Sequence, residues 1–153
     1  MQRLEELEQL VPHIKIKVDR NMPNKLSGLY YDGTILLNGN NSYYKQIETI
    51  AEEIGHYETS YGDITDCSQI THAKQEVKAR RYGHQLILNL DTLIEAFKAG
   101  VQSDYELAEY FQVSTKYIHE AVHSMKIKYG ISHYYDGHII RFDPLQVYKY
   151  IEY

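Results

Sequence analysis

The stretch Asn41–Glu58, NSYYKQIETIAEEIGHYE, decides how the rest of this 153-residue chain is interpreted. Asn41 or Ser42 suits a helix N-cap, because either side chain can accept a hydrogen bond from the first helical turn. Apolar residues then recur at steps of three and four, the period of a helix with one buried stripe: Tyr43, Ile47, Ile50, Ile54 and Tyr57. The pattern predicts an amphipathic helix.

Three of the ionisable residues on this predicted helix lie close together. Glu52 and His56 are four residues apart and so project from one face, with Glu53 beside them. The layout reproduces the His-Glu-x-x-His metalloprotease motif except at its first position, where Glu52 replaces a histidine. A zinc site of this type needs two ligands one turn apart, a third ligand from another element and an open fourth position. The helix is therefore a candidate metal-binding element.

A second long helix is predicted from Thr71 to Leu90, THAKQEVKARRYGHQLILNL. Gly83 inside it costs about 1 kcal/mol relative to alanine, which indicates close approach of another backbone, with the first helix as the candidate. Glu76 on this helix would then supply the third metal ligand. Glu53 would act as the base that removes a proton from the attacking water.

The residues before the motif helix predict a small sheet. Residues 2–11 have leucines at steps of three and predict a short helix, and His13–Val18 alternates as a strand does. Leu26–Leu37 places Asp32-Gly33 between two apolar arms, which favours a β-hairpin with a type I′ turn.

The C-terminal part predicts helices and a second hairpin. Asp91 is expected to cap a helix over residues 92–98, and the sequence from Ser103 to Gly130 resembles a helix-turn-helix with its turn at Val113-Ser114. Asp136-Gly137 predicts a hairpin that could form a wing, and residues 144–153 a short closing helix. The expected fold is α+β: a minimal zincin-like domain with a small antiparallel sheet in residues 1–100, and a helix-turn-helix-like, wing-bearing part in residues 101–153.

Composition and charge exclude several classes of protein. The chain is 43% hydrophobic and 24% charged, as in soluble globular domains, and its N-terminus is an acidic helix pattern rather than a signal peptide. The single cysteine, Cys67, cannot form an internal disulfide and suits a reducing compartment, so we expect a cytoplasmic protein with no membrane contact. The formal net charge of −5, with four acidic against three basic residues in the helix-turn-helix-like segment, argues against direct nucleic-acid binding.

A literal His-Glu-x-x-His also occurs, at His119-Glu120-Ala121-Val122-His123. Its context differs from a metal site, because the apolar stripe of that helix takes the buried face and leaves both histidines towards solvent. No acidic residue on a later long helix follows to complete a ligand set. Two exposed histidines on a surface helix are the simpler interpretation, and metal binding there stays open.

Five segments together resemble the ImmA/IrrE family of metallopeptidases, in its phage and mobile-element branch. They fall between residues 10 and 130: LSGLYYDGTILLNG (26–39), ETIAEEIGHYETSYGDI (48–64), KQEVKARRYG (74–83), LAEYFQVS (107–114) and KIKYG (126–130). The resemblance implies His56 and Glu76 as metal ligands, with Glu76-Val77-Lys78-Ala79 matching the family's Glu-x-x-Ala, and Glu53 as the base. Glu52 departs from the family at the first ligand position. Two carboxylates with one imidazole favour harder ions, so Zn²⁺, Mn²⁺ and no metal all stay open.

The resemblance also implies a function. We expect a metal-dependent endopeptidase in the bacterial host cytoplasm that acts on a phage or mobile-element repressor, a DNA-binding protein, and so relieves repression. The alternative is a non-catalytic antirepressor, a protein-binding module that kept the scaffold and lost turnover through Glu52. A DNA-binding regulator is a third hypothesis.

Overall fold

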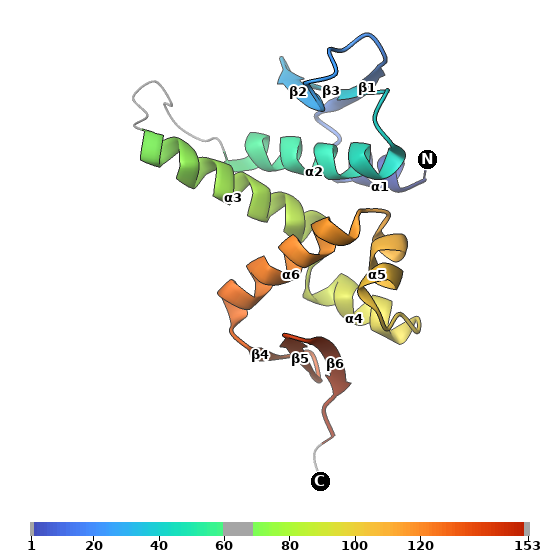
Figure 1. Ribbon diagram of the computed structural model, residues 1–153, viewed down its shortest axis with the longest axis vertical. Helices are drawn as coiled ribbons and strands as arrows, with labels where there is room; N and C mark the ends of the chain where they lie inside the picture. The colour runs from blue at the N-terminus through green and yellow to red at the C-terminus, as the bar shows by residue number, and fades with distance from the viewer. Residues whose placement is uncertain (1, 60–68, 152–153) are drawn as a thin grey trace. The chain divides into compact units, whose positions relative to one another are not determined.

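The chain forms two compact units, Met1–Leu86 and Ile87–Tyr153, shown in Figure 1. The computed structural model describes residues 2–59 and 69–151, so Cys67 lies outside the described residues. The domain boundary that the sequence analysis places after residue 100 stays a prediction. Among the helices described, none has the length and apolar character needed to cross a membrane.

The first unit begins with a short helix and a three-stranded sheet. Its elements are α1 (Gln2–Leu10), β1 (Lys15–Asp19), β2 (Gly28–Tyr31) and β3 (Thr34–Asn38). The predicted hairpin is confirmed: β2 and β3 pair antiparallel, and Asp32 and Gly33 between them have φ values of 46° and 73°, as a type I′ turn requires.

The direction of β1 differs from the prediction. The strand order is β1-β3-β2, and β1 runs parallel to β3, so an entirely antiparallel sheet is wrong. The reason is the connection. Residues 20–27 carry the chain past β3 to the far edge of the sheet, where β2 begins, and the return through β3 then has the direction of β1.

Two long helices complete this unit, α2 (Tyr43–Thr59) and α3 (Gln69–Ile87). Ser42 is the N-cap of α2, since its Oγ accepts a hydrogen bond from the Lys45 backbone N–H at 3.2 Å. In Figure 1, α2 lies between the sheet and α3. Its buried stripe joins residues of α1, β3 and α3 in one core: Leu7, Ile35, Leu37, Ile47, Ile50, Ala51, Ile54 and Ala79.

The second unit begins with α4 (Leu90–Lys98), and its N-cap is Asn89. The Asn89 side chain accepts a hydrogen bond from the Thr92 backbone N–H, and the Thr92 hydroxyl accepts one from the Asn89 backbone N–H, each at 3.0 Å. The prediction of Asp91 as the cap is wrong, because this reciprocal pair starts the helix earlier and places Asp91 in the first turn.

A helix pair and a second sheet follow: α5 (Asp104–Phe111), α6 (Thr115–Tyr129), β4 (Ser132–Tyr135), β5 (His138–Phe142) and β6 (Leu145–Lys149). Asp136 and Gly137, with φ values of 47° and 72°, repeat the turn of the first hairpin. The predicted closing helix over residues 144–153 is wrong. Leu145 and Val147 are half-buried and Gln146 between them is exposed, the alternation of a strand, and β6 pairs antiparallel with β5.

Candidate metal centre

Two glycines let α2 and α3 pack backbone against backbone. A Cβ atom built on Gly83 would lie 2.7 Å from the Ala51 carbonyl oxygen, and one built on Gly55 would lie 2.0 Å from that of Ala79. Real side chains do not tolerate such distances, so only glycine fits at these positions. The predicted close approach of Gly83 to the motif helix, now α2, is confirmed.

This close packing brings Glu76 on α3 beside the ionisable face of α2. The Nε2 atom of His56 lies 3.6 Å from Glu76 Oε2 and 4.0 Å from Glu52 Oε1, and the three potential ligand atoms all lie within 4.8 Å of one another. Ligands about 2.1 Å from a tetrahedral metal ion lie roughly 3.4 Å apart. A small inward movement of these half-exposed side chains would therefore suit one cation, and the donor set of one imidazole and two carboxylates fits it.

Glu53 lies next to this group on α2. Burial raises the pKa of its carboxyl above the ordinary value, His56 lowers it, and the neighbouring Glu52 and Glu76 raise it again. A raised proton affinity makes a carboxyl group better suited to take up a proton from water and pass it on. The residues predicted as three ligands and a base thus come together in one place, on two helices.

Residues 12–123 match the family model of peptidase M78, described as an IrrE N-terminal-like domain. The chain belongs to the peptidase M78 family. The resemblance to ImmA/IrrE metallopeptidases is thereby confirmed, and the matched range includes the whole candidate metal centre.

One solved structure similar to this M78-family chain is a Mycobacterium tuberculosis transcriptional regulator, with a TM-score of 0.60 and 13% sequence identity. The likeness covers 78% of this chain and 39% of the regulator, so the chain spans well under half of that protein's length. At this identity the comparison establishes similarity of fold. No curated protein matched the chain in sequence.

Strand β2 borders the candidate metal centre of this M78-family domain, which the sequence did not predict. A Cβ on Gly28 would lie 2.6 Å from Thr49 Cγ2 and 3.4 Å from Glu53 Cγ, so the strand begins directly over α2. The rings of Tyr30 and Tyr57, 5.3 Å apart, join the same two elements. Gly28 could have indicated this position of β2 in the sequence, since a glycine in a strand often marks the close approach of another group.

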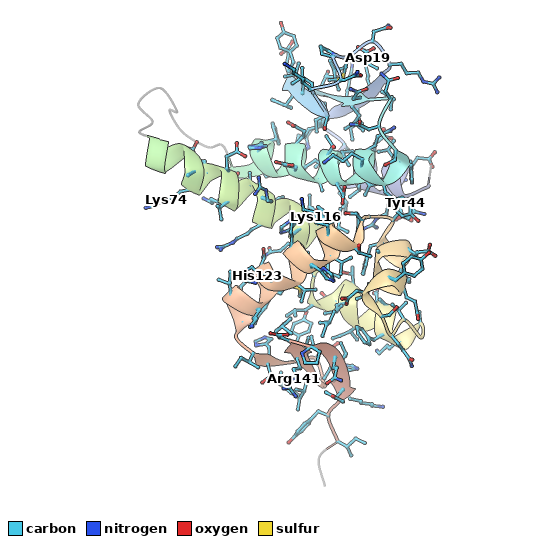
Figure 2. The ribbon with its side chains drawn as sticks, viewed as in Figure 1. Asp19, Tyr44, Lys74, Lys116, His123 and Arg141 are labelled. Atoms are coloured by element: carbon cyan, nitrogen blue, oxygen red, sulfur yellow. The ribbon has the colours of Figure 1, made fainter. Side chains whose placement is uncertain are left out.

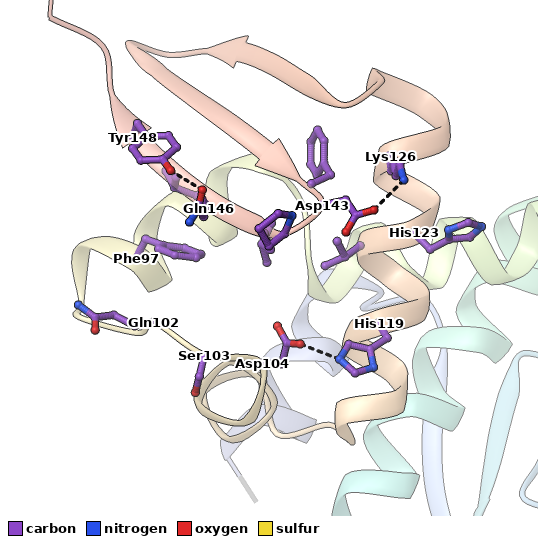
Figure 3. Close-up of a pocket in the computed structure, with 15 residues that line it drawn as sticks. Phe97, Gln102, Ser103, Asp104, His119, His123, Lys126, Asp143, Gln146 and Tyr148 are labelled. Atoms are coloured by element: carbon purple, nitrogen blue, oxygen red, sulfur yellow. Dashed lines mark hydrogen bonds and ion pairs between the residues drawn. The ribbon is translucent and has the colours of Figure 1, made fainter.

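The literal His-Glu-x-x-His has a different environment. His119 Nε2 lies 2.7 Å from Asp104 Oδ2, and both side chains are more than half exposed. Figure 3 shows this pair and the Lys126–Asp143 pair around an open hollow of about 900 Å³ in the second unit. Within residues 2–59 and 69–151, the group close enough to share a metal ion is Glu52, His56 and Glu76, and neither His119 nor His123 joins such a group.

Proposed function

We propose that this M78-family chain is a metal-dependent endopeptidase of the bacterial cytoplasm. Its substrate is a DNA-binding repressor of a phage or mobile element, and cleavage relieves repression. The observation that supports this best is the convergence of Glu52, His56 and Glu76 within 4.8 Å, with Glu53 beside them. The fold it shares with a protein described as a transcriptional regulator agrees with a regulatory role.

His56, Glu76 and Glu52 would hold the metal, either Zn²⁺ or Mn²⁺. When bound, the metal supplies a Lewis acid that polarises the scissile carbonyl and makes water a stronger nucleophile near neutral pH. The half-exposed ligand side chains leave this position open to a substrate. A site with three protein ligands and an open fourth position is the arrangement that catalytic zinc sites use.

Glu53 acts as the general base in this mechanism. It takes the proton of the attacking water and then delivers it to the leaving amine, a task for which its raised pKa is suited. Strand β2 is an edge strand of its sheet, and Gly28 at its start lies over Glu53. An extended substrate peptide pairs its backbone with this edge, which holds the scissile bond near the base.

The test uses protein purified without an affinity tag, titrated with Zn²⁺ and Mn²⁺ and then incubated with the host element's repressor. Glu53→Gln keeps the size of the side chain and removes its proton affinity, so cleavage should fall by about 10²–10⁴-fold while metal affinity stays unchanged. Absence of both metal binding and a Glu53→Gln effect would reject the enzyme.

The second candidate function is a non-catalytic antirepressor, favoured by Glu52 at the position where the family has a histidine. Such a protein would bind the repressor without cutting it. Intact repressor recovered in a stable complex with the metal-loaded protein would establish this function, whereas cleaved fragments would establish the peptidase.

We also propose that residues 101–153 form a helix-turn-helix-like part with β4–β6 as its wing, which docks a protein rather than DNA. The tight connection between α5 and α6 supports this, since Gln112 adopts a left-handed conformation and Ser114 caps α6. The acidic balance of the segment disfavours phosphate contacts. Salt-sensitive binding of duplex DNA would favour the third hypothesis, a DNA-binding regulator.

A further inference from the structure

The exposed face of α3 has a groove that the metal centre does not use. Its volume is about 660 Å³, and its lining includes Ala73, Lys74, Val77, Lys78, Arg81 and Tyr82. Lys74, Lys78 and Arg81 are spaced by four and three residues and so follow one side of the helix. Figure 2 shows Lys74 on the side of α3 that faces away from α2.

The charge of α3 is opposite to that of the whole chain. Its sequence, QITHAKQEVKARRYGHQLI, has four basic residues and one acidic residue, Glu76, whereas the chain has 16 basic and 21 acidic residues. Three of those four basic residues line the groove. Such a concentration of positive charge on an acidic protein attracts an acidic partner and orients it.

The groove also has apolar surface. Val77 is 44% exposed and Tyr82 37% exposed, and both line the groove together with Ala73. The stems of lysine and arginine add further apolar area beneath their charged ends. Apolar and aromatic side chains bordered by arginine are typical of protein-binding surfaces, and a groove of this size suits several side chains of a peptide.

We infer that this groove binds an acidic segment of the protein substrate, one in which apolar residues alternate with aspartate or glutamate. The inference rests on the proposed function, because it names a second contact between the peptidase and its substrate. Glu76 lies on the same helix as the groove. A substrate held there stays near the metal centre, which raises the effective concentration of its cleavage site.

A nucleic acid is the competing occupant, since phosphates also bind lysine and arginine. The groove favours the peptide for two reasons. Its apolar lining would gain nothing from contacts with the phosphate backbone of a nucleic acid. The formal net charge of −5 also repels a polyanion as large as DNA.

The test measures binding of a fluorescein-labelled peptide in which glutamate pairs alternate with leucine and valine. Its twin with lysine in place of glutamate and a labelled DNA duplex are the comparison probes. Fluorescence anisotropy at low and high salt should show binding of the acidic peptide alone, weakened by salt. Lys78→Glu/Arg81→Glu should weaken that binding by about tenfold or more, and Val77→Ser by several-fold.

A matched control is Lys17→Glu/Lys25→Glu, two exposed lysines of the same unit that are not among the groove-lining residues. It changes the net charge equally and should alter the affinity by less than about twofold. The milder Lys78→Gln/Arg81→Gln pair should give an intermediate loss, and circular dichroism establishes that each variant is folded.

Equal effects of the groove and control pairs, no binding by the wild-type protein, or preferred binding of the duplex would each overturn the inference. Glu53→Gln separates it from the proposed function. That variant should bind the acidic peptide as the wild type does. Peptide binding without repressor cleavage would therefore establish the groove as a peptide-binding site and reject the peptidase activity. Repressor cleavage that Lys78→Glu/Arg81→Glu does not change would reject the groove as a substrate contact and leave the peptidase activity standing.

Discussion

The carbonyl group of Ala79 lies directly against the Cα atom of Gly55, so close that a Cβ on Gly55 would be 2.0 Å from the Ala79 oxygen. This contact fixes how near α3 approaches α2. Glu76 lies one turn before Ala79 on α3, and His56 follows Gly55 on α2. The separation of the two helices therefore determines the 3.6 Å distance between Glu76 and His56.

Gly55→Ala tests this relationship. Alanine favours a helix over glycine by about 1 kcal/mol, but here its methyl group would push the backbones apart, so we expect a net destabilisation of about 1–3 kcal/mol. Urea unfolding measures the change in stability, and metal affinity should also fall because the candidate ligands Glu76 and His56 move apart. Lys45→Ala, at an exposed position of α2, should change the stability by about 0.5 kcal/mol or less. Unchanged or increased stability in Gly55→Ala would contradict the packing.

Glu52→His restores the missing histidine of the family motif. Two imidazoles and one carboxylate suit Zn²⁺ better than one imidazole and two carboxylates, so we expect about tenfold or tighter Zn²⁺ binding and a smaller gain for Mn²⁺. Competition with a chromophoric chelator measures both affinities. Glu58→His adds a histidine to the same helix outside the candidate ligand group and serves as the control. Equal gains in the two variants would mean that Glu52 is not a ligand.

His84 on α3 should make stability depend on pH. Its burial, and secondarily Arg80 and Arg81, lower its pKa from 6.5 to about 4. Between these values the unfolded chain takes up a proton that the folded chain does not, so the free energy of unfolding falls as the pH drops from 6.5 towards 4. The loss of stability approaches about 3 kcal/mol at pH 4. Above pH 6.5 the imidazole is neutral in both the folded and the unfolded chain, so no stability is lost there.

The measurement for His84 is urea unfolding of the wild type and of His84→Gln across this pH range. Aspartate and glutamate residues also titrate there, so the difference between the two proteins is the quantity to follow. The stability of the wild type relative to the variant should diminish as the pH falls, because glutamine does not titrate and so only the wild type is destabilised by protonation at this position. A difference that is constant from pH 7.5 down to about 4.5 would show that His84 is not responsible.

Thr92→Val removes one of the two reciprocal hydrogen bonds that begin α4. Valine keeps the shape of threonine but loses the hydroxyl that accepts from the Asn89 N–H, so we expect a destabilisation of about 1 kcal/mol. Thermal unfolding measures it. Glu95→Ala, an exposed position in the same helix, should be nearly neutral. A loss no greater than that of Glu95→Ala would mean that the Thr92 hydroxyl does not stabilise the helix start.

Local chemistry made several features predictable from the sequence. Asp32-Gly33 and Asp136-Gly137 each predicted a type I′ turn, because few residue pairs adopt positive φ values at two consecutive positions. Gly83 predicted the helix contact for a similar reason, since a glycine inside a helix needs a compensating close approach. This helix contact, together with the spacing of Glu52 and His56, predicted that Glu76 lies close to those two residues.

Other features depend on distant parts of the chain. Alternation identified β1 as a strand, but its direction relative to β3 is set by where residues 20–27 cross the sheet, which no local pattern encodes. Residues 145–149 are too few to separate a strand from a helix by period, and pairing with β5 decides. Asn89 and Asp91 are both good caps, and the position of Thr92 chooses between them.

The two edges of the first sheet differ in their capacity for self-association. Exposed strand edges pair with other chains and cause aggregation unless charged residues, lysine above all, discourage it. Strand β1, KIKVD, has exposed Lys15 and Lys17, whereas β2, GLYY, has no charged residue. The edge that we propose accepts the substrate peptide is therefore also the edge by which two copies of this chain would pair at high concentration, and a bound peptide would prevent that pairing.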